Sequence, residues 1–344
     1  MRIVFFNHKG GVSKTTTTFH LGWKLSQRGH RVLLVDADPQ CNLSGIIMQD
    51  NFEQYYTEEN TRKKNLMDGV NSAFQGRPEP ISAFDCYNVP NNENLFLLPG
   101  HPNLTELEPA LSFAQTSNNA FATMQNLPGS FNALIDKCFD HHDIEYVLID
   151  LNPGLSAINQ NFFSISDIFI VPTNPDPFSL MAVRTLADVL PRWYSAAQQM
   201  RTTFVNSSYP FPNHNPKFAG VVIQRFNIRS GRPSTPYRNN MDEILASVTT
   251  DLVPKLGQHS MLFQADLYTH TGIPANYCLA EIPDFQSLLP QSHKFGVPVY
   301  ALSDVQIERA GTVLEQMINK RDEFNQMFVE FALKIEEIKE NAES

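Results

Sequence analysis

The sequence has few of the residues that mark secreted, metal-binding or membrane-spanning proteins. Its 344 residues include four scattered cysteines and ten histidines, and neither set has the spacing of metal ligands. No apolar run approaches the ~18 residues that a membrane helix needs. Only a short apolar stretch, residues 3–6, precedes the first polar segment, which is unlike a signal peptide. We therefore expect a cytoplasmic protein with reduced thiols.

Positive charge is also scarce. The chain has 26 Lys and Arg residues against 36 Asp and Glu residues, so its net charge is −10 and its isoelectric point about 5.5. Such a balance disfavours a polyanionic partner unless basic residues gather locally. Apolar residues make up 42% of the chain, which is enough for the core of one large α/β domain with insertions.

Apolar strand candidates alternate with helical stretches along the chain. The strand candidates are residues 2–7, 31–36, 94–98, 145–151, 168–173 and 218–226. The helical stretches are about 14–28, 131–139, 155–164, 179–199 and 239–255. Strands that are apolar almost throughout are typical of a mostly parallel, twisted sheet with helices on both faces, an α/β fold. Ligands of such sheets bind at the carboxyl ends of the strands.

A glycine-rich turn between the first strand and the first helix indicates phosphate binding. In the segment Lys9–Thr16, backbone N–H groups and the start of the helix can hold phosphate oxygens. Lys14 would reach the β- and γ-phosphates of a nucleotide, and the Thr15 hydroxyl would bind Mg²⁺. The usual pattern has glycine at positions 8 and 13, where this chain has His8 and Ser13.

The second lysine of this turn, Lys9, makes it resemble the deviant Walker A box of the ParA/MinD family of ATPases. Three further segments resemble family motifs in the family's order: a second strand with a switch, a Walker B strand and an Ile-Pro stretch, at residues 31–44, 145–150 and 273–283. A chance match of four segments in order is improbable. The resemblance implies a P-loop NTPase fold and the cofactors ATP and Mg²⁺.

The resemblance also assigns ligand-binding roles to residues of this chain. The nucleotide would be held by the loop residues Gly10, Gly11, Val12, Ser13, Lys14, Thr15 and Thr16. The magnesium shell, partly through water, would be held by Thr15, Asp36 and Asp150.

Catalysis would involve Lys9, Lys14 and Asp38. Asp38 lies at the position of the family carboxylate that orients the attacking water. Lys9 would reach across a homodimer to the nucleotide of the second copy, as an arginine finger does. ATP would therefore lie between two subunits and hold them together.

The chain departs from the family pattern at three positions. Ser13 and Cys41 replace glycines, and Asn152 replaces a proline after the Walker B strand. If position 13 requires a positive φ, a serine there costs ~1–2 kcal/mol. We therefore expect a slow ATPase that a partner protein stimulates.

Basic residues at the end of the strand candidate 218–226 and just after it are candidates for DNA contact. Arg225, Arg229 and Arg232 lie in a stretch without an acidic residue, and Arg229 resembles an arginine through which ParA proteins contact DNA. Against this interpretation, Ala275 and Cys278 stand where the family has arginines. The alternative is a solvated basic loop over the nucleotide.

Two segments look inserted into a P-loop ATPase domain of residues 1–302. Residues 50–93 are polar and rich in asparagine, and residues 200–216 are rich in proline. Solvated loops are the favoured interpretation of both insertions, and contacts with a partner are the alternative.

Residues 303–344 are predicted to form a long C-terminal helix. Ser303 with Gln306 suits a helix N-cap. Apolar residues recur three or four positions apart, broken only by Arg321, at Leu314, Met317, Phe324, Phe328, Phe331, Ile335 and Ile338. The helix either packs along its own domain or contacts a partner or a second copy. Its excess of acidic residues is unlike a membrane-binding helix, so we expect no membrane contact.

Together these features predict a ParA-like ATPase whose ATP-bound homodimer binds DNA nonspecifically. A partner protein of the centromere-binding type would stimulate hydrolysis, and the cargo task would be plasmid or chromosome partition, with the protein cytoplasmic or associated with the nucleoid. The alternative is a regulatory switch, in which the same ATP dimer controls a dedicated protein partner, such as a positioning or defence complex, and transports no DNA.

Overall fold

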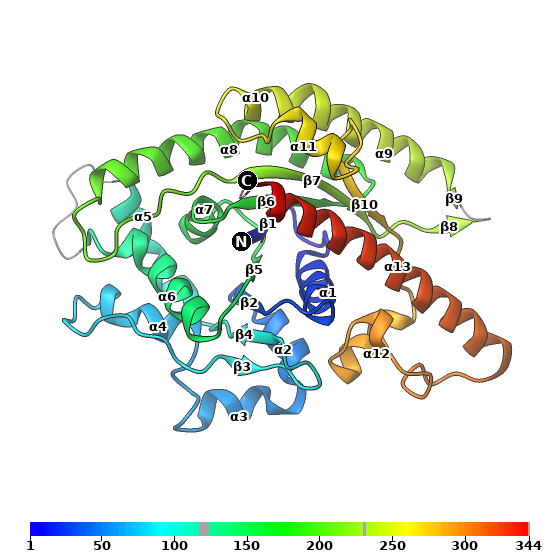
Figure 1. Cartoon of the computed structure of the whole chain (residues 1–344), viewed down its shortest axis with the longest axis horizontal. Coiled ribbons are helices and arrows are strands. Elements are labelled where there is room, and N and C mark those ends of the chain that lie inside the picture. The colour runs from blue at the N-terminus through cyan, green and yellow to red at the C-terminus, as the bar shows by residue number, and fades with distance from the viewer. Residues whose placement is uncertain (117–123, 230–231, 343–344) are drawn as a thin grey trace.

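The chain forms a twisted eight-stranded sheet (Figure 1). The computed structural model describes residues 1–116, 124–229 and 232–342. The strands of the sheet are β1 (Arg2–Phe5), β2 (Val32–Ala37), β3 (Tyr87–Asn88), β4 (Leu95–Leu98), β5 (Tyr146–Leu151), β6 (Ile168–Thr173), β7 (Lys217–Gln224) and β10 (Cys278–Ile282). Their order is β10-β7-β6-β1-β5-β2-β4-β3, and all neighbours run parallel except β3 and β4. The predicted α/β class is confirmed.

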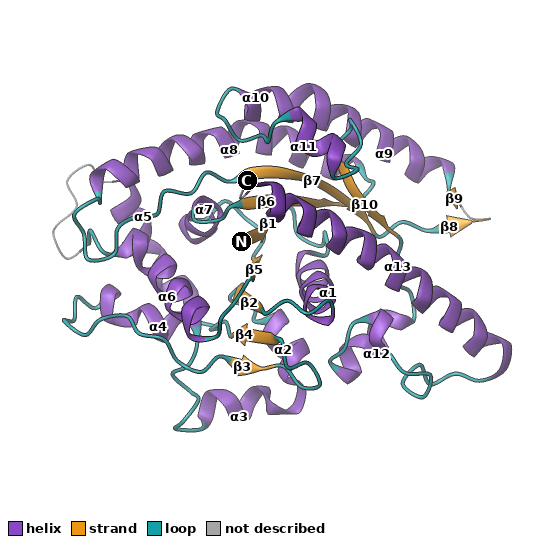
Figure 2. Ribbon diagram, viewed as in Figure 1, coloured by secondary structure: helices purple, strands orange, loops and turns teal. Residues whose placement is uncertain are grey.

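Helices lie on both faces of the sheet (Figure 2). They are α1 (Lys14–Gln27), α2 (Asn42–Met48), α3 (Phe52–Thr57), α4 (Leu66–Phe74), α5 (Glu108–Thr116), α6 (Leu127–His141), α7 (Ala157–Ser164), α8 (Pro177–Thr203), α9 (Thr235–Ser247), α10 (Val253–Gly257), α11 (Ala265–His270), α12 (Leu288–Phe295) and α13 (Gly311–Ala342). Shorter turns are the 3-10 helices η1 (Gln49–Asn51), η2 (Leu104–Leu107) and η4 (Val299–Ala301) and the π-helix η3 (Val248–Leu252). The separate hairpin β8 (Ile228–Arg229) and β9 (Arg232–Pro233) follows β7.

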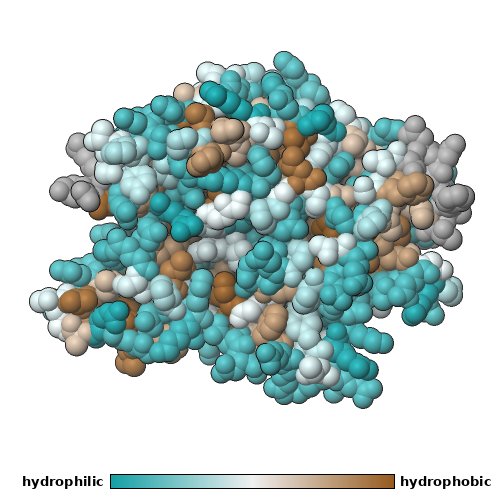
Figure 3. Space-filling model, turned by 180° about the vertical axis from the view of Figure 1, so that it is seen from behind, coloured by the Kyte–Doolittle hydropathy of each residue, from teal (hydrophilic) through white to brown (hydrophobic). Residues whose placement is uncertain are grey.

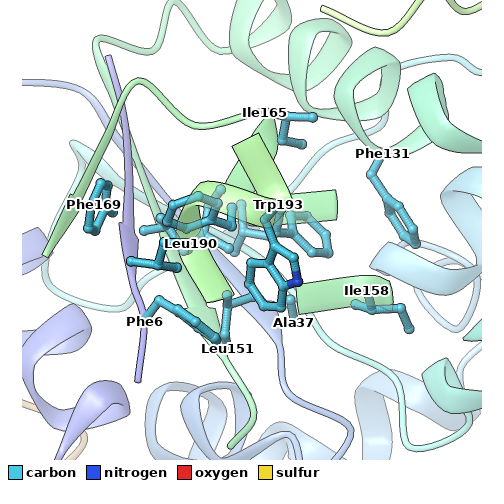
Figure 4. Close-up of a cluster of buried hydrophobic side chains, with 14 of the residues drawn as sticks. Phe6, Ala37, Phe131, Leu151, Ile158, Ile165, Phe169, Leu190 and Trp193 are labelled. Atoms are coloured by element: carbon cyan, nitrogen blue, oxygen red, sulfur yellow. The ribbon is translucent and has the colours of Figure 1, made fainter. Parts of the chain in front are cut away.

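Each face of the sheet has its own hydrophobic core, because successive side chains of a strand point to opposite faces. Val4 and Phe6 point into a core shared with α4 to α9. In that core the rings of Phe6 and Trp193 lie 5.0 Å apart between centroids (Figure 4). Ile3 and Phe5 point into the second core, which α1, α12 and α13 cover. Near-continuous apolar strands therefore reflect a sheet that is buried on both sides.

The segment 50–93 differs from the expected solvated loop. It contains α3, α4 and β3, and Tyr55, Leu66 and Val70 are buried. Its polar residues cover the outside of these short elements, which is why the composition resembled that of a loop. In the segment 200–216, no helix or strand follows the end of α8, although Phe204 and Phe211 are buried.

The C-terminal helix begins eight residues later than predicted, at Gly311 instead of Ser303. The backbone N–H of Ser303 does donate to Gln306 Oε1 (2.8 Å), but this pair closes an isolated turn and caps no helix. The apolar stripe of α13, including Phe328 and Phe331, is buried in the second core. This burial supports packing along its own domain.

The face of the molecule that is turned away from the viewer in Figure 1 is mostly hydrophilic, with small scattered hydrophobic patches (Figure 3). Among the described residues, none of the helices combines the length and the hydrophobicity that crossing a membrane requires.

Candidate nucleotide-binding site

The loop between β1 and α1 adopts a backbone conformation that its sequence does not favour. Ser13 has φ 58° and ψ 32°, in the left-handed region, and Gly11 has φ 71°. The first helical bond of α1 runs from the Thr17 N–H to the Ser13 carbonyl (2.9 Å). The expected positive φ at position 13 is therefore present, and a glycine would adopt it without the cost that a Cβ adds.

A cavity of about 520 Å³ opens at this loop, at the carboxyl ends of β1, β2, β5 and β7. That volume lies in the range of ligand sites, and the position is where open parallel sheets bind ligands. The lining comprises residues 10–16 of the loop together with Asp38, Gln40, Asn42, Leu151, Pro153, Arg225, Asp284, Phe285 and Leu289. All seven loop residues that were expected to bind nucleotide therefore line one cavity.

Three side-chain amides that sequence reasoning missed hold the loop in place. Gln224 donates to the Val12 carbonyl (3.2 Å) and Asn174 donates to the Gly11 carbonyl (3.0 Å). Asn7 accepts from the Lys9 N–H (3.0 Å). The signal that could have found them is a polar amide at or just past the end of an otherwise apolar strand, here β7, β6 and β1.

Lys14 is buried under the loop. Its side chain donates to the carbonyls of Asn7 (3.1 Å) and Lys9 (3.3 Å). Burial lowers the pKa of Lys14, and the charges of Asp150 and Asp38 partly offset that effect. A cation held among carbonyls at the start of a helix is suited to bind phosphate oxygens.

Lys9 pairs within its own chain. Its ammonium lies 2.5 Å from Asp176 Oδ2 and 2.9 Å from Ser179 Oγ. Asp176 also caps α8, because its Oδ1 accepts from the Ser179 N–H (2.8 Å). In a single copy, Lys9 is therefore tied to the first turn of α8.

The three predicted carboxylates gather beside the loop. Asp36 and Asp150 are register partners on the neighbouring strands β2 and β5, and both are fully buried. Burial raises the pKa of Asp36 to about 6, and hydrogen bonds from Ser44 oppose the shift. Burial and the charge of Asp36 raise the pKa of Asp150 well above its ordinary value. Asp38 lines the cavity, and its Oδ1 accepts from the Gln40 N–H (2.9 Å).

Both carboxylate oxygens of Asp150 are buried, and no well-formed hydrogen bond from the described residues reaches them, although the Thr15 hydroxyl lies near enough to oppose the rise in the Asp150 pKa. Burying a carboxylate without a partner is costly, so a cation that pairs with it stabilises the site. In the described part of the chain, no group of three or more His, Cys, Asp or Glu residues could hold a metal by itself. A hydroxyl and two carboxylates fit Mg²⁺, which keeps several waters and shares its shell with substrate phosphates. Thr15, Asp36 and Asp150 therefore fit the expected metal.

The three candidate DNA-contacting arginines do not share one environment. Arg225 lines the cavity, and its guanidinium donates to the Gly11 carbonyl (3.0 Å). This placement matches the alternative of a basic residue over the nucleotide. The backbones of Arg229 and Arg232 form the β8–β9 hairpin, and their side chains lie outside the described part of the chain.

Comparison with known proteins agrees with this geometry. The family model of an AAA domain matches residues 1–201. The chromosome-partitioning ATPase Soj of Thermus thermophilus is 30% identical over 190 residues, which are 55% of this chain and 61% of that protein. The chromosome partitioning protein ParA of Caulobacter vibrioides is 29% identical over 189 residues, 54% and 60% of the two chains. The matched region thus spans about three fifths of these two relatives.

Solved structures with the same fold cover nearly the whole chain. Protein DIP2308 of Corynebacterium diphtheriae has a TM-score of 0.63 at 20% identity, covering 86% of this chain and 96% of its own. Apo McdA of Cyanothece has a TM-score of 0.55 at 17% identity, with coverage of 94% and 98%. The putative plasmid partition protein BB_S35 of Borrelia burgdorferi, bound to AMPPNP, has a TM-score of 0.52 at 17% identity, with coverage of 92% and 96%.

The family model covers more than half of the chain, and the switch and Walker B motifs converge with the phosphate loop on one cavity. The chain therefore belongs to the ParA/MinD family of P-loop ATPases.

Proposed function

We propose that this chain binds ATP with Mg²⁺ in the cavity and hydrolyses it to ADP and phosphate. The observation that carries the proposal is the carboxylate of Asp150, which is fully buried beside Asp36 and close enough to Lys14 and Thr15 of the phosphate loop to interact with both. Thr15, Asp36 and Asp150 would hold Mg²⁺, which neutralises charge on the phosphates. Lys14 would turn from the loop carbonyls to the β- and γ-phosphate oxygens, and the N–H groups of residues 10–16 would hold the rest.

Asp38 would orient the attacking water. It lines the cavity and its side chain is mostly buried, so it is fixed relative to the loop. Burial raises the pKa of Asp38, while Lys14 opposes the shift. A carboxylate with a raised pKa accepts a proton from water more readily than an ordinary aspartate does.

We also propose that ATP holds two copies together. Lys9 would leave Asp176 and reach the nucleotide of the second copy, where the charge of the γ-phosphoryl group attracts it more strongly than one carboxylate does. Exposed apolar side chains near the cavity support such an interface: Leu155 (48% exposed), Phe178 (69%) and Met181 (64%). Phe178 and Met181 lie near the start of α8, whose N-cap Asp176 holds Lys9 in a single copy.

The task of the ATP dimer would be partition of a plasmid or chromosome. The similarity to the chromosome-partitioning proteins Soj and ParA supports this task. The dimer would bind DNA nonspecifically through Arg229, and a partner of the centromere-binding type would stimulate hydrolysis. A switch that controls a dedicated protein partner is the second candidate. Two observations favour it. The first is the net charge of −10, which disfavours a polyanionic partner. The second is that two arginines of this region already have partners in the chain: Arg225 bonds to the loop, and Arg238 pairs with Glu281 (3.3 Å).

Binding to a nonspecific DNA duplex separates the two candidates. The purified protein is titrated with ATP, with ADP and without nucleotide across a salt series. Partition predicts binding only with ATP, weakening steeply as salt rises, and loss of that binding in Arg229→Glu. Binding in no state, with intact ATP hydrolysis, favours the protein-partner switch.

A further inference from the structure

A chain of hydrogen bonds connects the inserted segment 50–93 to Asp36. The phenol of Tyr56, on α3, donates to the Gly100 carbonyl (2.7 Å). The Gly100 N–H donates to Ser44 Oγ (3.1 Å). The Ser44 hydroxyl in turn donates to Asp36 Oδ2 (2.6 Å), and the Ser44 N–H donates to the same oxygen (2.8 Å). Tyr56 is therefore connected through Gly100 and Ser44 to one carboxylate oxygen of Asp36.

The ionised form of Asp36 sets the direction of these bonds. An ionised carboxylate only accepts, so the Ser44 hydroxyl donates its one proton to Asp36 and accepts from the Gly100 N–H. From the described residues, Asp36 Oδ2 receives two short bonds, whereas Oδ1 receives only the long bond from the Asp38 N–H (3.3 Å). Oδ1 of Asp36 is therefore the oxygen whose lone pairs are more available to a metal ion or its water ligands.

Space also fixes this contact, because only glycine fits at position 100. A Cβ there would lie 2.9 Å from the Asp36 carbonyl oxygen and 3.1 Å from Asp36 Cγ. It would also lie 3.2 Å from Cys41 Sγ, beside the left-handed Cys41 residue (φ 52°) that starts α2. The backbone at Gly100 is thus pressed against the carboxylate, and any shift of Gly100 is transmitted to Asp36 through Ser44.

We propose that Ser44 and Tyr56 are positioning residues for Asp36, and that α3 of the inserted segment thereby sets the affinity of the site for Mg²⁺. The proposal rests on the proposed function, in which Asp36 belongs to the magnesium shell. Hydrogen bonds behind a metal-binding carboxylate orient it, and their loss typically costs 10- to 100-fold in metal affinity. The inserted segment would then change the affinity of the ATPase for Mg²⁺ without contacting the nucleotide.

The test separates metal binding from nucleotide binding. A fluorescent ATP analogue is bound first in EDTA and then with increasing Mg²⁺, and the Mg²⁺ concentration at half-maximal response is measured. Ser44→Ala should raise that concentration about tenfold and leave binding in EDTA unchanged. Ser44→Thr, which keeps the hydroxyl, should restore it. Tyr56→Phe should raise it about threefold, because its neutral bond acts one step further away.

Tyr55→Phe is the matched control. It is the same change on the same helix, but the Tyr55 phenol donates to the Lys64 carbonyl (2.8 Å) and not to Gly100. This variant should respond to Mg²⁺ like the wild type. If Ser44→Ala does not fold, Tyr56→Phe against Tyr55→Phe decides the question alone.

Wild-type Mg²⁺ dependence in both Ser44→Ala and Tyr56→Phe would overturn the positioning role. An equal loss of binding in EDTA and in Mg²⁺ would also overturn it, since it would show a general disturbance of the cavity. If the wild type itself binds the analogue without any dependence on Mg²⁺, the proposed function fails, and this inference fails with it.

Discussion

The phosphate loop and the C-terminal helix are held in different ways. In the loop, individual polar atoms decide the geometry: Gln224, Asn174 and Asn7 each bond to one backbone group. In α13, a stripe of apolar side chains is buried in the second core, and polar bonds along the helix, such as the two from Arg28 to Glu336 (2.7 and 2.8 Å), add to it. Chemistry in this molecule is therefore concentrated in a few atoms, whereas the attachment of the helix is spread over many contacts. The two regions should respond differently to substitution.

Lys14→Ala should separate activity from stability most strongly. The variant loses the cation at the β- and γ-phosphates, and we expect ATP hydrolysis to fall by about 10²–10³-fold or more. The two cores are untouched, so the melting temperature should stay close to that of the wild type. Steady-state phosphate release and a thermal melt are the two measurements. Hydrolysis at the wild-type rate would remove Lys14 from the mechanism.

Phe328→Ala should have the opposite pattern. Phe328 is 1% exposed in the second core, and such truncations cost about 3–5 kcal/mol. Leu333→Ala, on the same helix but at a side chain 40% exposed, is the control and should cost less than about 1 kcal/mol. Denaturant unfolding gives both values. Equal small losses would mean that α13 is not packed on its domain.

His20, on α1, lies between the phosphate loop and α13, and it makes the contact between these two regions sensitive to acid. Its ring stacks on Phe285 (5.0 Å between centroids) and packs against Phe328 (5.2 Å). The Val299 N–H donates to Nε2, so Nδ1 carries the proton and donates to the Thr16 carbonyl. Burial lowers the pKa of His20 to about 3.

The unfolded chain binds a proton at His20 below pH 6.5, whereas the folded chain does not until about pH 3. The contribution of His20 to stability is therefore complete above pH 6.5, declines as pH falls, and is lost at about pH 3. Between pH 8 and pH 5 the free energy of unfolding should decrease by about 2 kcal/mol from this residue. His20→Gln should show a flatter pH dependence in denaturant unfolding; an unchanged slope would contradict the assignment.

Ser13→Gly should have the smallest effect. Relief of the left-handed serine is worth about 1 kcal/mol, part of which the greater freedom of glycine in the unfolded chain offsets. We expect a faster basal turnover or tighter nucleotide binding, measured by steady-state kinetics. Unchanged kinetics would show that Ser13 does not slow this ATPase.

Much of the fold and the loop could be predicted from the sequence because their determinants are local. Lys14 opens α1 as expected, and Asp36 and Asp150 lie side by side because neighbouring parallel strands end at one edge. The pairing of Lys9 with Asp176 could not be predicted, since 167 residues separate them and no local pattern connects them. The same holds for the Tyr56–Gly100 bond. The predicted start of the C-terminal helix at Ser303 was wrong, because the same Ser–Gln pair that caps a helix can also close an isolated turn.

Two other features needed the three-dimensional structure. The strand β10 was not predicted as a strand, because Glu281 interrupts its apolar residues. Arg225 was grouped with Arg229 by sequence, but its positive φ of 60° turns it into the cavity, where it bonds to Gly11. The side-chain direction of a single residue depends on such backbone detail, which composition does not reveal.

The most direct test of the central claim is the molar mass of the protein in solution with Mg²⁺ and a non-hydrolysable ATP analogue, with ADP, and without nucleotide. The chain has a mass of 38.9 kDa. The account predicts twice that mass only in the state with Mg²⁺ and the analogue. For Lys9→Ala it predicts the mass of a single copy in all three states. The same mass for the wild type in all three states would contradict an ATP-held dimer.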